Sequence, residues 1–268
     1  MHTRFLSLLQ SPDDGSSLTL CTARVDGDDV LEGTLTDGAG RIYPIEDGIP
    51  RLLPGTLLAA QKSEIAARDA QVDDYDKMAG LHLFGKIEIP LTRQALAPRP
   101  SDLLLEAGCG TGRMTPTWAQ AAGELVAVDF SFESVRVCRR KLKALGITHV
   151  HLAQADVCAL PLKPQTFDRV VSCQVLEHVP GPDARRRAVE NLARVARPGA
   201  TLALSAYKHS LLTRAFAQKE GEHDGGIPFF RFTARELRDT LAASFDVQRV
   251  SGALIYLYLA TCTKRKEG

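Results

Sequence analysis

The sequence lacks several features that mark specialised classes of protein. No apolar run approaches the roughly 18 residues that a membrane-spanning helix needs, and the apolar stretch near the N-terminus is too short for a signal peptide. Its six cysteines form no C-x-x-C pair, which argues against disulfides and structural zinc. A net charge of +1 gives no general electrostatic case for binding nucleic acid or an anionic membrane. We therefore expect a cytoplasmic globular protein without a membrane span.

The 268 residues are enough for one large domain with a small appendage. Residues 16–54 hold short alternating stretches separated by turn signals, which predict a small β-rich unit over residues 1–56. Helix formers dominate residues 57–80 and 86–96, and they predict a helical cap over residues 57–100. The proline-containing stretch 97–102 reads as a linker to a core domain over residues 101–268.

Short apolar runs alternate with helical segments throughout the core domain. Strands are expected at 103–107, 124–129, 149–154, 169–173, 200–206, 245–250 and 253–261, and helices at 112–122, 131–145, 183–197 and 233–243. Continuous Val, Leu and Ile runs are typical of buried parallel strands. The pattern predicts an α/β fold with a doubly wound, mostly parallel, seven-stranded Rossmann-like sheet. The last two strands, with Ser251-Gly252 as the break, should form an antiparallel hairpin at one edge.

The stretch LLLEAGCGTGR at residues 103–113 places three glycines directly after the first core strand. Taken alone, such a loop also serves as a simple tight turn, but glycine lets backbone approach a ligand at the carboxyl end of a strand. The G-x-G-x-G spacing differs from the dinucleotide fingerprint, and the Glu106 carboxylate would repel a pyrophosphate while suiting an ammonium group. Asp129 and Asp156, which follow the next two strands, are placed to accept from ribose hydroxyls and from an adenine amino group.

The chain at about residues 70–262 resembles the class I S-adenosylmethionine (SAM)-dependent methyltransferases, and among them the ubiquinone and menaquinone methylases. The motifs that carry the resemblance are EAGCGTG, VAVDFS, QADVCALPL, FDRVVSCQVLEHV and LARVARPGATLALS. It implies SAM as cofactor, S-adenosylhomocysteine (SAH) as product, and a small-molecule substrate. The cofactor-binding residues that it implies, with Tyr75 either closing over the cofactor or only packing, are Tyr75, Glu106, Gly108, Cys109, Gly110, Gly112, Asp129, Phe130, Asp156, Val157, Cys173 and Gln174.

The stretch RIYPIEDGIPRLLP resembles the end of a zinc-ribbon-like module that precedes many bacterial methyltransferases. Both cysteine pairs of that module are missing here, and Cys21 alone cannot form a tetrahedral site. We expect a metal-free remnant held by apolar residues such as Ile42, Ile45 and Ile49. It is either a platform for substrate or partner, or a structural cap on the core.

Catalysis by positioning, assisted by a general base, is expected for methyl transfer. His178 in QVLEHV is the sharpest candidate, although a histidine there also serves within the fold. With Gln174 and Glu177 it forms a pattern related to a metal site, but an amide weakens a hard-cation site, and no metal is expected. Residues 207–232 are either a substrate lid with Gly225-Gly226 as hinge, which we favour, or a surface loop whose aromatic side chains only pack on the core. The lid adds Tyr207 and His209 as catalytic candidates. Arg231 either meets an anionic substrate group or pairs on the surface.

Other functions remain open at this point. An rRNA or tRNA methyltransferase is one alternative, but the fourth strand ends in SCQV and lacks the pattern that stacks a flipped base, so nucleic acid is not the expected partner. A non-catalytic SAM-binding partner protein is another, and a nicotinamide dehydrogenase fits the glycine spacing less well. A homodimer is compatible with the sequence. The acceptor atom and the substrate are not specified by it.

Overall fold

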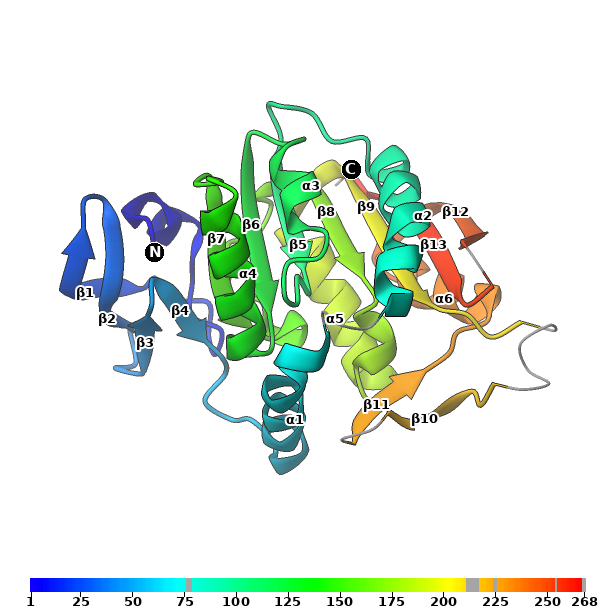
Figure 1. Cartoon of the computed structure of the whole chain (residues 1–268), viewed down its shortest axis with the longest axis horizontal. Coiled ribbons are helices and arrows are strands. Elements are labelled where there is room, and N and C mark those ends of the chain that lie inside the picture. The colour runs from blue at the N-terminus through cyan, green and yellow to red at the C-terminus, as the bar shows by residue number, and fades with distance from the viewer. Residues whose placement is uncertain (76–78, 211–216, 224–225, 254, 267–268) are drawn as a thin grey trace.

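A computed structural model describes residues 1–75, 79–210, 217–223, 226–253 and 255–266, and for residue 60 and residues 73–84 at most the backbone. One mixed sheet of eleven strands runs through the molecule in the order β1-β2-β3-β4-β7-β6-β5-β8-β9-β13-β12 (Figure 1). Its strands are β1 Thr19–Asp26, β2 Asp29–Thr36, β3 Ile42–Glu46, β4 Ile49–Leu52, β5 Leu103–Ala107, β6 Glu124–Asp129, β7 Val150–Ala155, β8 Phe167–Cys173, β9 Ala196–Tyr207, β12 Phe245–Ala253 and β13 Leu257–Lys264.

The five strands β7-β6-β5-β8-β9 are parallel, and β13 and β12 join them antiparallel. The central strands are buried on both faces, since four of the five residues of β5 are buried and the other is half-buried. The expected doubly wound, mostly parallel sheet with an antiparallel edge hairpin is therefore confirmed. Because β5 to β9 run in parallel, their carboxyl ends meet at one edge of the sheet.

Helices cover both faces of this sheet (Figure 1). On one face lie α2 (Ala79–Leu96), α3 (Thr115–Ala119) and α4 (Phe132–Ala144), and on the other α5 (Gly181–Val195) and α6 (Ala234–Ala242). The largest fully buried side chain, Trp118 of α3, packs against Leu96 and Leu104. No helix among the described residues is long and apolar enough to cross a bilayer.

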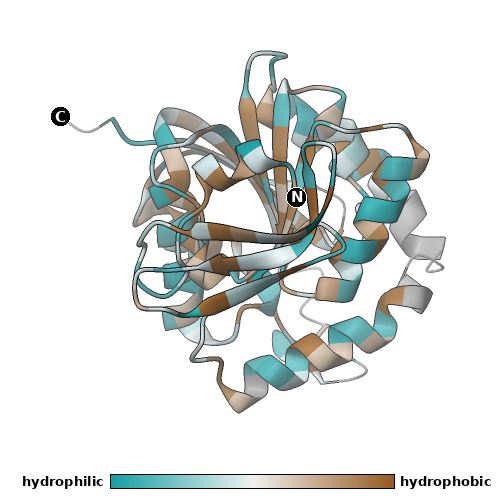
Figure 2. Cartoon of the chain, turned by 90° about the vertical axis from the view of Figure 1, so that its left-hand side faces the viewer, coloured by the Kyte–Doolittle hydropathy of each residue, from teal (hydrophilic) through white to brown (hydrophobic). Residues whose placement is uncertain are grey.

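The N-terminal segment forms the expected hairpins, preceded by a short 3-10 helix, η1 (Thr3–Leu8). Apolar and polar residues alternate along its strands (Figure 2). Because β4 pairs in parallel with β7, the N-terminal strands are continuous with the sheet of the core. Ile45 and Ile49 are buried as expected, but Ile42 is 66% exposed. The prediction for Ile42 is wrong because it begins β3 on the outward face of the alternating pattern. The division of the chain into separate domains stays a prediction.

Three boundary predictions are also wrong. The helix expected at 112–122 is only α3, and it begins later than expected because Gly112 has a φ of +82°, which is not helical. The cap helices are α1 (Ala59–Tyr75) and α2, so the second one begins earlier than residue 86. Ser251 and Gly252 form no break: they belong to β12 and pair with Leu259 and Tyr258 of β13.

Two elements lie beyond the carboxyl ends of the parallel strands. One is α1, which contacts α4 and the small hairpin made by β10 (Glu220–His223) and β11 (Ile227–Phe230) (Figure 1). The other is this hairpin itself, which contacts η3 (Leu176–His178), the 3-10 turn that follows β8. A further 3-10 turn, η2 (Val157–Ala159), follows β7. Together these elements frame the edge where the predicted cofactor residues lie.

Candidate active site

Glu106 is a buried carboxyl group in β5, immediately before the glycine loop. Trp118 Nε1 donates a hydrogen bond to its Oε1 at 3.1 Å, while its Oε2 is buried without a partner among the described residues. Burial raises the pKa of Glu106 to about 8, although Thr115, Trp118 and Arg113 favour the carboxylate. An orphaned acceptor at this depth is costly unless a donor occupies it. Glu106 is thus suited to an ammonium group.

The three glycines of the loop all have positive φ, and they differ in what surrounds them. A Cβ on Gly108 would lie 2.0 Å from Val175 Cγ2, and one on Gly112 would lie 2.7 Å from Cys138 Sγ. At Gly110 a Cβ would meet no heavy atom within 4 Å. The outer two glycines therefore let the loop pack on the protein, while Gly110 faces open space. Cys109 between them is buried and carries its thiol beside the Gly110 carbonyl oxygen at 3.6 Å.

Asp129 ends β6 next to this loop. Its carboxylate accepts from the backbone N–H of Gly110 at 2.7 Å and of Ser131 at 2.9 Å. Burial raises its pKa, and these backbone hydrogen bonds together with Arg68 oppose the shift. A carboxylate has about four acceptor positions, so Asp129 can still accept from a further donor. Phe130 follows, and its carbonyl oxygen accepts a hydrogen bond from Gln154 Nε2 at 3.0 Å.

Asp156, after β7, caps the turn η2 by accepting from Cys158 N at 2.8 Å, and Val157 begins that turn. The other carboxylate oxygen accepts from Gln61 Nε2 of α1 at 3.0 Å. Gln61 Oε1 in turn accepts from Leu58 N, which fixes the direction of the amide. Burial raises the pKa of Asp156. A side-chain NH₂ group of α1 thus holds the acceptor that the sequence assigned to an adenine amino group.

The end of β8 carries Cys173 and Gln174 beside the end of β5. Burial raises the pKa of the Cys173 thiol, so it is protonated at neutral pH. Gln174 has a φ of +57°, which is unusual for a residue with a side chain. Its Nε2 donates to Glu88 Oε2 at 2.7 Å, and Glu88 is a residue of α2 that the sequence did not single out.

Glu177 and His178 follow in η3. Both carboxyl oxygens of Glu177 are buried without a hydrogen bond among the described residues, and burial raises its pKa to about 8. His178 Nδ1 lies 2.8 Å from the Pro228 carbonyl oxygen, which can only accept, so Nδ1 carries the proton. Burial, helped by the nearby Arg68 charge, lowers the pKa of His178 to about 3. The imidazole is therefore neutral, with its acceptor at Nε2.

The predicted catalytic candidates lie in one aromatic cluster, with one exception. The His178, Tyr207 and His223 rings have centroids 5.5 to 5.9 Å apart, and Phe229 lies 4.7 Å from His223. The exception is His209, whose ring is in none of these contacts and whose Nδ1 is buried without a partner among the described residues.

The two roles predicted for Arg231, contact with an anionic substrate group and surface ion pairing, stay predictions. The Arg231 guanidinium stacks on Phe229 at 4.3 Å and donates to the Gln218 carbonyl oxygen, so it is engaged within the fold. Of the predicted hinge, Gly226 has a φ of +78°, while Gly225 lies outside the described residues. The side chain of Tyr75, the last residue of α1, also lies outside them.

Sequence reasoning missed the inner face of α1. Besides Gln61, Asp69 accepts from Ser131 Oγ at 2.5 Å, and Arg68 is held by Glu64 at 2.7 Å while its charge acts on Asp129, Glu177 and His178. The spacing 61, 64, 68 marks one face of a helix, and its polar character was the available signal. The sequence could not show that this face of α1 covers the ends of β6 and β7.

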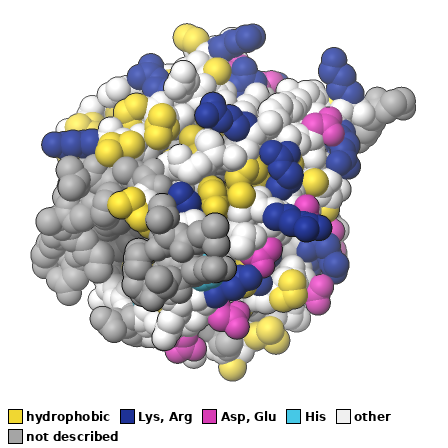
Figure 3. Space-filling view, turned by 90° about the vertical axis from the view of Figure 1, so that its right-hand side faces the viewer, with side chains coloured by type: hydrophobic (Ala, Val, Ile, Leu, Met, Phe, Trp, Pro, Cys, Tyr) yellow, Lys and Arg dark blue, Asp and Glu magenta, His cyan; other side chains and the backbone are white. Residues whose placement is uncertain are grey.

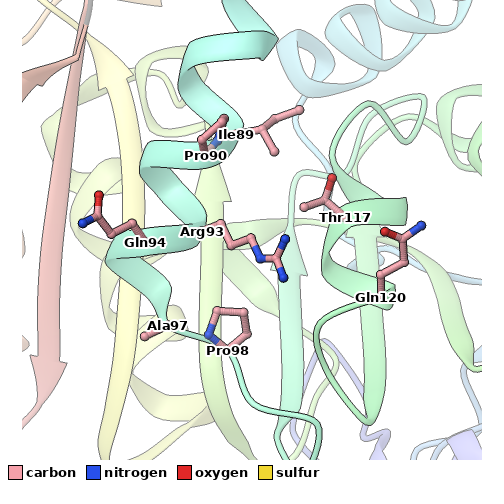
Figure 4. A pocket seen from close by; sticks show the side chains of 8 residues that line it. All are labelled: Ile89, Pro90, Arg93, Gln94, Ala97, Pro98, Thr117 and Gln120. Carbon is pink, nitrogen blue, oxygen red and sulfur yellow. The ribbon is translucent and has the colours of Figure 1, made fainter.

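A shallow hollow of about 630 Å³ lies elsewhere, between the C-terminal half of α2 and α3 (Figure 4). Figure 4 shows Arg93 reaching across it toward Thr117. None of the predicted cofactor or catalytic residues lines it. We therefore take the carboxylates at the strand ends, and not this hollow, as the candidate active site. Among the described residues, no group of three His, Cys, Asp or Glu is arranged to hold a metal ion.

Comparison with known proteins shows what this chain is similar to. Residues 105–204 match the model of a methyltransferase domain. An O-methyltransferase of Pyrenophora dematioidea is 31% identical over 41% of this chain and 41% of its own length. A ubiquinone biosynthesis O-methyltransferase of Xanthomonas euvesicatoria is 30% identical over 52% of this chain and 55% of its own. The chain thus spans about half the length of these curated relatives or less.

A solved structure of DhpI in complex with SAH superimposes with a TM-score of 0.62 and 21% identity, and covers 79% of this chain and all of its own. At that identity the likeness shows the fold. These similarities agree with the resemblance that the sequence motifs around the glycine loop indicated. Residues 105–204 are thus similar to a methyltransferase domain, and the fold is similar to that of the solved DhpI–SAH complex.

Proposed function

We propose that this protein binds SAM at the carboxyl ends of β5, β6 and β7 and transfers its methyl group to a small-molecule acceptor. One observation carries the proposal: Glu106, Asp129 and Asp156 stand at three successive strand ends around a glycine loop. The site also fits the cofactor in detail. The orphaned Glu106 Oε2 suits the ammonium group, and the open space at Gly110 lets backbone approach the ligand. SAM, when bound, supplies a methyl group made electrophilic by the sulfonium.

The residues of this chain would divide the work of binding. Glu106 would hold the ammonium group, and Asp129 would accept from the ribose hydroxyls. Asp156 and the backbone of Val157 would hold the adenine, and Gln61 would give up its contact to Asp156. Gln174 and Cys173 would lie along the methionine portion. Such contacts fix the reacting groups in line, and positioning of this kind supplies much of the acceleration in a transfer between two bound molecules.

The neutral His178 supports an acceptor that carries an O–H or N–H group. Its Nε2 can accept a hydrogen bond from that group and orient it, because Nδ1 is committed to the Pro228 carbonyl. A pKa of about 3 makes it a weak base in this state. Tyr207 and His223 beside it add two aromatic rings, which meet the imidazole at 76° and 56°. We therefore favour an aromatic or conjugated alcohol or amine, and the hairpin β10–β11 as the lid over it.

RNA as acceptor is less well supported. On the face shown in Figure 3, Lys and Arg are scattered among Asp and Glu instead of forming a stripe. A protein that binds RNA through its phosphates needs clustered positive charge. The cytoplasmic location and the homodimer remain expectations. So does the role of the N-terminal unit, for which the continuity of β4 with β7 supports a structural cap.

Transfer of labelled methyl groups tests the function. The purified protein would be incubated with methyl-labelled SAM and, separately, with a small-molecule extract and with total RNA. We expect label in the small-molecule fraction only, and none with an Asp129→Ala variant that still folds. Label in RNA would replace the acceptor class. Binding of SAM without any transfer, across extracts from varied sources, would favour the non-catalytic alternative.

A further inference from the structure

Glu88 is a buried carboxylate with three hydrogen-bond donors around it. It lies on α2, is 1% exposed, and connects that helix to the ends of β8 and β9 by hydrogen bonds. Gln174 Nε2 donates to it at 2.7 Å, Ser205 Oγ at 2.7 Å and Arg113 Nη2 at 3.0 Å. A buried carboxylate is tolerated when it is satisfied in this way. Its partners come from three separate segments: Arg113 follows the glycine loop, Gln174 follows β8, and Ser205 lies in β9.

The contact to Gln174 fixes a side-chain direction. A carboxylate can only accept, so the NH₂ end of the Gln174 amide must face Glu88. The carbonyl oxygen of the amide is therefore the end left to accept from a ligand. The backbone is held as well, because Gln174 N donates to the Ser205 carbonyl at 3.1 Å while φ stays at +57°. Glu88 accepts hydrogen bonds from the side chains of both Gln174 and Ser205, and these bonds help to hold the strained backbone of Gln174 in place.

We propose that Glu88 is a positioning residue for the cofactor: it orients the Gln174 amide so that its carbonyl oxygen accepts from the positively charged methionine portion of SAM. This inference rests on the proposed function. It links α2 of the cap to the methyl-transfer end of the site through a single side chain. It also explains why a charged residue is buried on α2, where an apolar residue would cover the sheet without a desolvation cost.

A double-mutant cycle tests the inference by calorimetric titration with SAH. Glu88→Gln removes the charge and leaves one acceptor oxygen for three donors, so we expect affinity to fall about tenfold. In a Gln174→Ala background the same change should cost less than about twofold, since the amide that Glu88 orients is gone. An equal loss in both backgrounds would overturn the inference and assign Glu88 a purely structural role. No loss in either would overturn it too.

Two further variants keep the test decisive. Glu88→Asp retains the charge but shortens the side chain, and it serves if Glu88→Gln does not fold, with the same coupling to Gln174 expected. Asp37→Asn is the matched control: Asp37 is a buried carboxylate that accepts from Ser11 and Arg41 in the N-terminal unit. It should lower the melting temperature without changing SAH affinity. If the wild-type protein does not bind SAH at all, the proposed function fails, and that outcome is distinct from wild-type binding without coupling.

Discussion

The buried Glu106 carboxyl predicts that cofactor affinity depends on pH in a particular way. With its pKa at about 8, the free protein carries Glu106 mostly protonated at neutral pH. Binding of the SAH ammonium group requires the carboxylate, so a proton leaves on binding. The pKa is raised, so the ionised fraction of Glu106 grows as pH rises toward 8. Affinity must therefore increase with pH until the α-amino group of the ligand itself loses its charge.

The size of the effect follows from the ionisation of Glu106. From about pH 6 to about pH 8 the ionised fraction of Glu106 rises roughly 50-fold, while the SAH ammonium group, which lies beside a free carboxylate, keeps most of its charge. That gain corresponds to roughly 2.3 kcal/mol. The affinity should pass through a maximum above pH 8, where the ammonium group begins to lose its proton. Calorimetry in buffers of different ionisation enthalpy would report the released proton directly.

Variants separate Glu106 from other groups. Glu106→Gln should bind SAH more weakly and lose the rise of affinity with pH. Glu177→Gln is the matched control, because Glu177 is also fully buried with a pKa of about 8 but lies in η3. It should keep the wild-type pH dependence. A Glu106→Gln variant with an unchanged affinity profile would refute the assignment of Glu106 to the ammonium group.

Three further predictions concern the loop, the cap helix and the histidine. Gly108→Ala should abolish stable folding, because a side chain lies 2.0 Å from the new methyl group. Gly110→Ala should fold but lose SAH binding. Equal melting temperatures of the two variants would contradict this prediction. Gln61→Ala should raise SAH affinity several-fold by freeing Asp156, and weaker binding would instead show that Gln61 contacts the bound ligand. His178 keeps a pKa of about 3 when folded, so stability falls as pH drops below its unfolded value near 6.5. His178→Gln should therefore recover about 1.7 kcal/mol of relative stability between about pH 6.5 and pH 5 in urea unfolding, and parallel curves would exclude a neutral buried imidazole.

Much of the core was predictable because its signals are local. The β5 and β6 strands have the expected bounds, since a continuous apolar run followed by a glycine or an aspartate leaves little freedom in where the strand ends. The glycine loop and the carboxylates Glu106, Asp129 and Asp156 came from the same local pattern. The SAM-binding roles of these residues stay proposals until a ligand is measured.

Other features depend on contacts between distant parts of the chain. Glu88 and Ser205 are separated by 117 residues, and Gln61 and Asp156 by 95. Helix propensity and periodicity show that positions 61 and 88 are helical, but they do not tell which strand end a helix covers. Ser251-Gly252 illustrates a second limit. A turn-like dipeptide stays within a strand when ladder pairing continues past it.

The central claim is that the strand-end carboxylates bind the cofactor, and SAH titration by calorimetry tests it most directly. We predict micromolar or tighter binding by the wild-type protein, and a loss of roughly 1.5–3 kcal/mol in Asp129→Asn and Asp129→Ala variants shown to be folded. Absence of binding by the folded wild-type protein, or binding that Asp129 does not affect, would contradict the account.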